Sequence, residues 1–197
     1  MNTRPPALGP LFRSDAQGEI LAKILLNPDQ SFTVTELAKA ARTPYASAHR
    51  EVSRMVQMGL VRAYKRGQSL DIRAATDFPI YQPLREILGF TYGPSAVIPR
   101  FLAGIDGIEQ AFIYGSWAAR REGEPGSAPG DVDVLVVGNP SRADIYDAAS
   151  KAGSAIGREV NIRILNAAAW SAGDDPFIRT VKQRPLIQVG LDATVAE

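Results

Sequence analysis

Two aspartates separated by one residue are the strongest chemical signal in this chain of 197 residues. Asp131 and Asp133 enter an apolar run that ends at Gly138. The run is rich in β-branched residues, which predicts a buried strand. Side chains at positions i and i+2 of a strand share one face, about 6.5–7 Å apart, so the two carboxylates are expected to point the same way. Their repulsion is usually compensated by a hard cation such as Mg²⁺, which prefers oxygen ligands.

A Gly-Ser pair lies upstream and supplies a second part of the expected site. Gly115 and Ser116 follow the apolar segment 111–114, which is expected to be a strand. Glycine allows a backbone to approach a phosphate closely, and a helix beginning near Ser116 would direct free N–H groups toward it. Arg120, just after this turn, is a candidate for a bidentate phosphate contact. The alternative is that the two aspartates only cap or form a turn and that Arg120 is only solvated.

The order of strand, Gly-Ser, spacer, Asp-x-Asp and strand resembles the nucleotidyltransferase superfamily, especially its minimal bacterial members. The resemblance implies that Gly115 and Ser116 bind nucleotide phosphates. It also implies that Asp131 and Asp133 bind Mg²⁺ as catalytic residues, and that a third acid lies on a later strand. The spacer of fourteen residues between Ser116 and Asp131 is somewhat long, because residues 122–130 have the composition of a loop insertion.

An amide stands where the resemblance implies the third acid. The next expected strand covers residues 160–165, and the position in question is Asn161. An amide oxygen can ligate a metal, but it carries no negative charge and is a very poor base. Glu159 and Arg163 share a strand face with Asn161, so Glu159 is a candidate substitute. Nucleotide binding is therefore expected, whereas catalysis is expected to be weakened.

The N-terminal part of the chain has a different pattern. Thr33 and Glu36 have the spacing of a capping box at the start of a short helix. One further helix is expected before it and one after it, followed by two strands around a tight turn at Gly67. The expected ranges are 14–26, 34–41 and 44–58 for the helices and 60–66 and 69–73 for the strands. This order is typical of a winged helix-turn-helix, and residues 33–73 resemble the small bacterial winged-helix regulators.

Polar and cationic side chains give the third helix and the hairpin a candidate DNA-binding face. Such a helix fits the major groove, and cations near the hairpin tip reach the phosphate backbone. Lys and Arg outnumber Asp and Glu in residues 1–76, which favours a polyanionic partner. The candidate residues are Tyr45, Ser47, His49, Arg50, Arg54, Arg62, Lys65 and Arg66. The alternative is a dimerisation or interaction module whose charges are only solvated.

Taken together, these patterns predict an α/β fold class, α+β overall, in two domains. A winged helix-turn-helix is expected over residues 18–76, followed by a nucleotidyltransferase-like mixed β-sheet of four or five strands with flanking helices over 96–197. A flexible arm is expected over residues 1–17. An ordered connector with one short helix is expected over residues 77–95.

Composition bounds the class of protein. A hydrophobic content of 45% with 22% charged residues is ordinary for a folded globular chain. There are no cysteines, which excludes disulfides and thiolate metal sites. No apolar stretch reaches the roughly 18 residues that a membrane span requires, and the first residues lack an apolar leader segment. We therefore expect a cytoplasmic protein that does not bind membranes.

Three functional hypotheses follow from these patterns. The first is a DNA-binding transcriptional regulator, expected to be a homodimer on double-stranded DNA, whose second domain binds a nucleotide with Mg²⁺ or docks a partner protein. The second is an active Mg²⁺-dependent nucleotidyltransferase, antitoxin-like, that modifies a protein or a small molecule with an NTP and uses the winged helix for autoregulation. The third is a degenerate transferase fold used only for assembly, since a fold alone does not establish a function.

Overall fold

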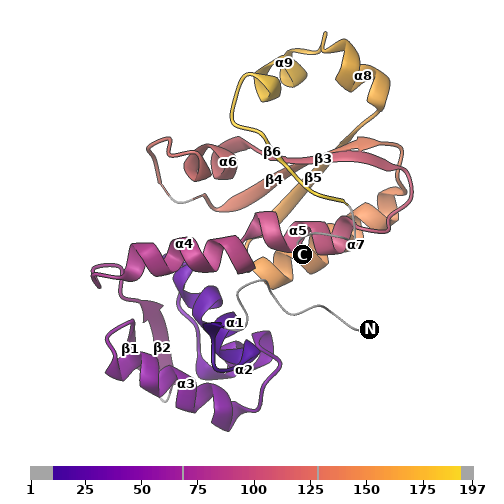
Figure 1. Ribbon diagram of the computed structural model, residues 1–197. Coiled ribbons are helices and arrows are strands. Elements are labelled where there is room, and N and C mark those ends of the chain that lie inside the picture. Colours follow the sequence, from indigo (N-terminus) through magenta and orange to yellow (C-terminus); the bar gives the residue numbers. More distant parts are fainter. Residues whose placement is uncertain (1–10, 68, 128, 192–197) are drawn as a thin grey trace. The chain divides into compact units, whose positions relative to one another are not determined.

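The computed structural model describes residues 11–67, 69–127 and 129–191 (Figure 1). It shows a mixed α/β protein with two sheets. The chain divides into two compact units, Met1–Gly93 and Pro94–Glu197, which are described separately below. Most of the arm expected over residues 1–17 lies outside the described residues. The first helix already begins at Asp15, because the Ser14 side chain accepts a hydrogen bond from the Gln17 amide and caps it.

The first unit combines helices with a two-stranded antiparallel sheet. The described elements are α1 (Asp15–Leu25), α2 (Val34–Ala40), α3 (Tyr45–Gln57), β1 (Val61–Arg66), β2 (Ser69–Ala74) and α4 (Tyr81–Tyr92). The capping box at the start of α2 is confirmed: the Thr33 hydroxyl accepts from the Glu36 amide, and the Glu36 carboxylate accepts from the Thr33 amide at 2.7 Å. These contacts satisfy backbone donors that a helix start leaves open.

Helix α4 completes the core of the first unit. Residues 77–95, expected as a connector, contain this helix of 12 residues. Its inner face carries Tyr81, Leu88 and Tyr92, which pack with α1 and α2 in one apolar cluster. The Tyr81 hydroxyl donates to the Leu25 carbonyl oxygen at 3.2 Å. A Cβ atom at Gly18 of α1 would lie 2.1 Å from the Tyr92 hydroxyl oxygen, so only glycine permits this close approach of the two helices.

The second unit is built on a mixed four-stranded sheet in the order β5-β4-β3-β6. Strands β4 and β5 are parallel, whereas β3 is antiparallel to both β4 and β6. The described elements are α5 (Pro94–Leu102), β3 (Ile108–Tyr114), α6 (Gly115–Arg121), β4 (Asp131–Gly138), α7 (Arg142–Ile156), β5 (Glu159–Leu165), α8 (Ala167–Ala172), α9 (Pro176–Lys182) and β6 (Ile187–Gln188).

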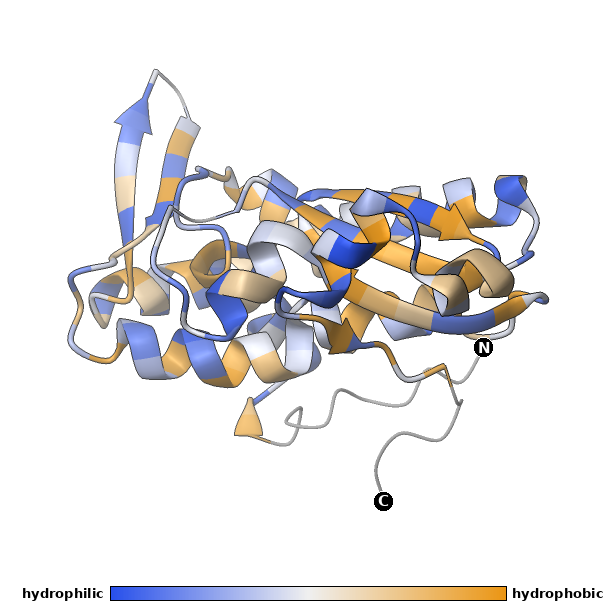
Figure 2. Ribbon diagram, turned by 90° about the horizontal axis from the view of Figure 1, so that it is seen from above, coloured by the Kyte–Doolittle hydropathy of each residue, from blue (hydrophilic) through white to orange (hydrophobic). Residues whose placement is uncertain are grey.

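Helices cover both faces of this sheet (Figure 1). Val132, Val134 and Val136 of β4 pack with α5 and α7 in one apolar cluster. On the opposite face, Leu135 and Val137 pack with residues of α8 and α9. Long orange stretches in Figure 2 mark apolar strands such as β4. A strand apolar on both faces is what a central strand between two helical layers requires.

Helix α8 was not expected from the sequence. Its N-cap residue is Asn166, whose side-chain oxygen accepts from the Ala169 amide at 2.7 Å. Asp175 caps α9 in the same way. None of the helices formed by the described residues has both the length and the apolar character needed to cross a membrane.

Candidate functional site

Gly115 begins the turn between β3 and α6 and lies against the Asp133 carboxylate. Its φ angle is +73°, in the left-handed region that favours glycine. A Cβ atom here would lie 2.4 Å from Asp133 Oδ2. Glycine is thus required both by the turn and by the close approach of a carboxylate. Ser116 follows on α6 and is exposed.

The two aspartates enter β4 side by side on one face, as the sequence predicts. Asp131 and Asp133 are half-buried, whereas Val132 and Val134 are fully buried on the other face. Asp133 is the strand neighbour of Tyr114 on β3 and of Asn161 on β5. The turn, the carboxylate pair and the amide at the expected third position therefore meet at one end of the sheet.

Asn161 acts as a hydrogen-bond donor in this arrangement. Its Nδ2 donates to Asp131 Oδ2 at 3.0 Å. This orientation of the amide pairs a donor with a carboxylate, which is the favourable choice. Glu159, the strand neighbour of Asp131, is exposed. Among the residues that the structure describes, no group of three acidic or histidine side chains is placed to share a metal ion, so Glu159 does not complete such a set.

The electrostatics of the pair are unfavourable in the absence of a cation. Burial raises the pKa of the Asp133 carboxyl above its usual range, and the charge of Asp131 raises it further. The hydrogen bond from Asn161 acts in the opposite direction. A carboxylate whose charged form is disfavoured by burial and by a like charge is typical of functional sites.

An aromatic and cationic flank of the site was missed by the sequence reasoning. The Arg163 guanidinium lies 3.8 Å from the centre of the Phe177 ring, and that ring meets Tyr114 edge to face at 5.7 Å. Burial raises the pKa of the Tyr114 hydroxyl, the nearby Asp133 adds to the increase, and Arg163 opposes it. The position of Tyr114 directly before Gly115 was the available signal for its place in the site.

Arg120 is bound to the loop over residues 122–130. Its Nη1 donates to the Glu124 carbonyl oxygen at 2.9 Å, and its Nε donates to the Ser127 carbonyl oxygen at 3.4 Å. A Cβ atom at Gly126 would lie 2.3 Å from Arg120 Nη2. The side chain that was predicted to bind phosphate therefore fastens this loop, and its phosphate contact stays a prediction.

The candidate DNA-binding residues lie on exposed surfaces of the first unit. Helix α3 buries Ala48, Val52 and Met55. On its outer face the Tyr45 and His49 rings lie 6.0 Å apart between centres, and Arg50 Nη2 donates to the Ser47 hydroxyl at 3.1 Å. The positively charged side chains of β1, which are Arg62, Lys65 and Arg66, are exposed as well.

Carboxylates accompany three of these cations. Arg54 pairs with Glu51 at 2.9 Å, Arg62 with Asp77 at 2.5 Å and Arg66 with Asp71 at 3.3 Å. The hydrogen bond between the Arg62 and Asp77 side chains raises the pKa of Arg62 and lowers that of Asp77. Arg50 and Lys65 form no ion pair within the described part of the chain. A phosphate would therefore meet these two cations directly and would have to displace a carboxylate from the other three.

Comparisons of the chain with protein-family profiles, with curated proteins and with solved structures found no match.

Proposed function

We propose that this protein is a DNA-binding regulator whose second unit binds a nucleotide together with Mg²⁺. The single observation that carries the nucleotide part is the contact between the Gly115 turn and the Asp133 carboxylate. It joins a turn suited to phosphate and a carboxylate pair suited to a metal into one site. The resemblance to minimal nucleotidyltransferases rests on the same residues.

The residues present fit a magnesium ion that shares its ligands with a nucleotide. Asp131 and Asp133 would hold it, and the ion would offset both the burial and the mutual repulsion that raise the pKa of Asp133. Mg²⁺ is commonly bound by one or two carboxylates, several waters and substrate phosphates. The ion would neutralise phosphate charge. The backbone of Gly115 and Ser116 would orient the phosphates, and the Arg163 guanidinium would add positive charge at the flank.

Slow or absent group transfer follows from the third position. Asn161 donates a hydrogen bond to Asp131 and offers no base at neutral pH. General-base assistance is typically worth 10²–10⁴-fold in rate. A site of this kind binds a nucleotide better than it turns it over, and this favours a sensing role.

Active transfer is the second candidate, and one observation favours it. Glu159 is the parallel strand neighbour of Asp131 and is exposed on the same face. A side-chain rotation on nucleotide binding would bring its carboxylate toward the pair. In that case the protein would transfer a nucleotidyl group to a protein or small-molecule acceptor.

Calorimetric titration of each NTP in the presence of Mg²⁺ tests the nucleotide part. Binding is expected for the wild type and should be lost in Asp131→Ala/Asp133→Ala. The control Asp144→Ala/Asp147→Ala removes equal charge from exposed positions of α7 and should bind normally. Release of pyrophosphate would favour the transferase over the regulator. If no NTP binds to the wild type, the nucleotide proposal is wrong.

The DNA part rests on α3 and the β1–β2 hairpin, whose order along the chain supports the proposal of a winged helix-turn-helix. The outer face of α3 offers Arg50, Ser47 and His49 for the major groove, and the hairpin offers Lys65 for the backbone. Binding to the region upstream of the protein's own gene should weaken in Arg50→Ala/Arg54→Ala. The control Arg100→Ala/Arg121→Ala removes the same charge from the second unit and should have little effect. An equal loss of DNA affinity in both variants would exclude α3 as the recognition helix.

A further inference from the structure

Strand β5 leaves one edge of the four-stranded sheet open. Within the described residues it pairs with β4 alone, in an unbroken register from Asp131–Glu159 to Val137–Leu165. The strand has seven residues and contains no proline or bulge. Such an edge presents a row of backbone N–H and C=O groups that another strand can pair with. The other edge strand, β6, has only two residues and offers much less.

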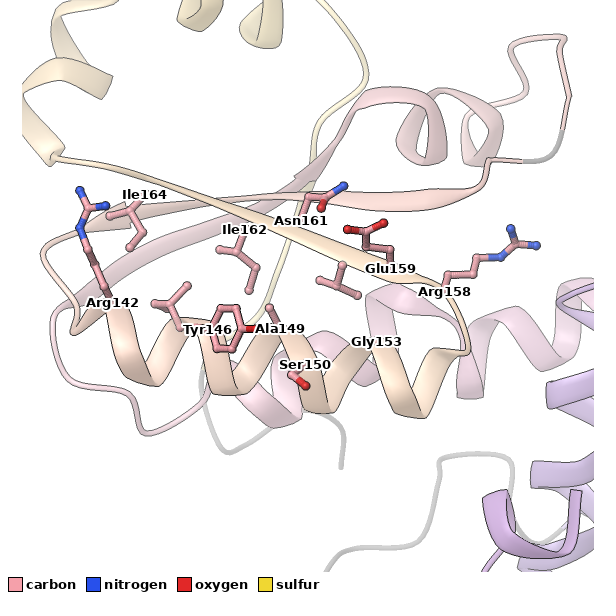
Figure 3. A pocket seen from close by; sticks show the side chains of 12 residues that line it. Arg142, Tyr146, Ala149, Ser150, Gly153, Arg158, Glu159, Asn161, Ile162 and Ile164 are labelled. Atoms are coloured by element: carbon pink, nitrogen blue, oxygen red, sulfur yellow. The ribbon is translucent and has the colours of Figure 1, made fainter. Parts of the chain in front are cut away.

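A groove lined by both apolar and polar side chains, with Arg142 and Arg158 among the latter, runs beside this edge. It has a volume of about 560 Å³ and lies between β5 and α7. Ile162 and Ile164 face it from the strand, and Tyr146 of α7, which is 79% exposed, borders it (Figure 3). The face of β5 that points toward α7 is thus only partly covered by that helix. Val160 is already buried in the core, whereas Ile162 and Ile164 are partly exposed, and an open edge beside a partly covered apolar face is a feature of interfaces.

We propose that a second copy of this chain pairs along β5 in the antiparallel direction, with the two-fold axis at Asn161. In this register Glu159 lies opposite the partner subunit's Arg163, and Arg163 lies opposite the partner subunit's Glu159. Opposite charges in directly facing positions stabilise a strand pair. On the groove side, Val160 meets the partner subunit's Ile162, so β-branched residues face each other twice. The strand is complementary to itself in both charge and apolarity.

Other registers lack this complementarity. With the axis at Ile162, Glu159 would face the partner subunit's Leu165 and Arg163 would face an amide. A parallel pair in register would set Arg163 against the partner subunit's Arg163, and like charges in facing positions are destabilising. Because the axis of an antiparallel pair is perpendicular to the sheet, both α7 helices lie on the same side. The two grooves then become one space between them.

The pairing adds a cation to the face that carries the candidate site. Asp131 and Glu159 are strand neighbours, so the row on this face becomes Asp131, Glu159 and the partner subunit's Arg163. Glu159 would then be engaged in an ion pair and would be less available as a substitute for the third acid. The inference rests on the edge and its charges and is independent of nucleotide binding.

A charge-swap series tests the pairing by sedimentation or light scattering. The wild type should be a dimer. Arg163→Glu and Glu159→Arg should each raise the dissociation constant about tenfold or more, because two ion pairs become two repulsions. The double variant Glu159→Arg/Arg163→Glu should restore the dimer. A monomeric wild type, single variants as dimeric as the wild type, or a double variant no better than the single ones would each overturn the proposal.

Cysteine cross-linking provides a second test in a chain that has no cysteine of its own. Facing residues of an antiparallel pair have Cβ atoms about 4.5–5.5 Å apart, close enough for a disulfide after a small adjustment. Asn161→Cys should therefore give a covalent dimer under mild oxidation. The control Gln188→Cys places a thiol at an exposed position of the other edge strand and should stay monomeric on a denaturing gel. Equal cross-linking of the two variants would refute the pairing.

Discussion

Replacing Asp133 by Asn is expected to stabilise the second unit by about 0.5–1 kcal/mol at neutral pH. The two carboxylates are about 7 Å apart along one strand face. At that distance two unit charges repel by about 0.6 kcal/mol in a water-like dielectric and by about 1.2 kcal/mol at half that dielectric, less some screening by salt. Because Asp133 is only half-buried, we take the lower part of this range. Asp133→Asn keeps the hydrogen bond from Asn161 Nδ2 to Asp131 Oδ2, and it gives up the smaller favourable interaction of Asn161 with the Asp133 carboxylate.

The stabilisation by Asp133→Asn should depend on pH. The folded-state pKa of Asp133 is raised, so its ionisation is harder in the folded than in the unfolded chain. The resulting destabilisation is absent below the unfolded-state pKa of about 3.9. It grows as the pH rises from there to the folded-state pKa, and it is complete above that pKa. The free-energy difference between Asp133→Asn and the wild type should therefore be full at pH 7 and shrink toward pH 4.

Urea unfolding followed by tryptophan fluorescence measures this difference. The chain has two tryptophans, Trp117 and Trp170, and both lie in the second unit, so the signal reports that unit. The control Asp147→Asn removes an acid that pairs with Lys151 on the exposed face of α7 and should not increase stability. Repulsion between the two carboxylates is excluded as a source of instability if Asp133→Asn is no more stable than the wild type at pH 7, or if its additional stability is equally large at pH 4.

Three further predictions follow from other contacts. Gly115→Ala should destabilise the second unit by about 1–3 kcal/mol in urea unfolding, because it combines a positive φ angle with a clash against Asp133; an unchanged midpoint would contradict the close approach. Asn161→Asp should lower stability without Mg²⁺ and tighten Mg²⁺-dependent NTP binding severalfold by calorimetry, and weaker binding would argue against a metal role for this position. Asp77→Ala should release Arg62 and tighten DNA binding a few-fold at low salt, and a loss of affinity in a filter-binding assay would show that the ion pair supports the binding surface instead.

Local patterns were sufficient to predict much of the fold. The period of two in β4 put Asp131 and Asp133 on one face and buried Val132 on the other, as the structure shows. The capping box at Thr33 likewise predicted the start of α2, because its contacts join residues only three positions apart. Signals of this kind depend only on neighbours in the chain, so the sequence is enough to find them.

Contacts between residues far apart in the chain could not be predicted from the sequence. The hydrogen bond from Asn161 to Asp131 depends on the register of two strands, which is set by packing. The stacking of Arg163 on Phe177 depends on where α9 lies. The hydrogen bonds from Arg120 to the loop backbone depend on the turn at Gly126, and no pattern in the loop's composition indicated them. Each of these contacts changes the expected chemistry of a residue whose place in its own element was predicted correctly.

A titration of Mn²⁺ in place of Mg²⁺, followed by its electron paramagnetic resonance signal with and without ATP, tests most directly whether Asp131 and Asp133 bind a metal together with a nucleotide. With a metal–nucleotide site at these carboxylates, the free Mn²⁺ signal should fall when the protein and ATP are both present, beyond the decrease that ATP alone causes. Asp131→Ala/Asp133→Ala should abolish this additional decrease. An additional decrease of equal size in the double variant, or none in the wild type, would contradict the assignment of a metal–nucleotide site to these two carboxylates.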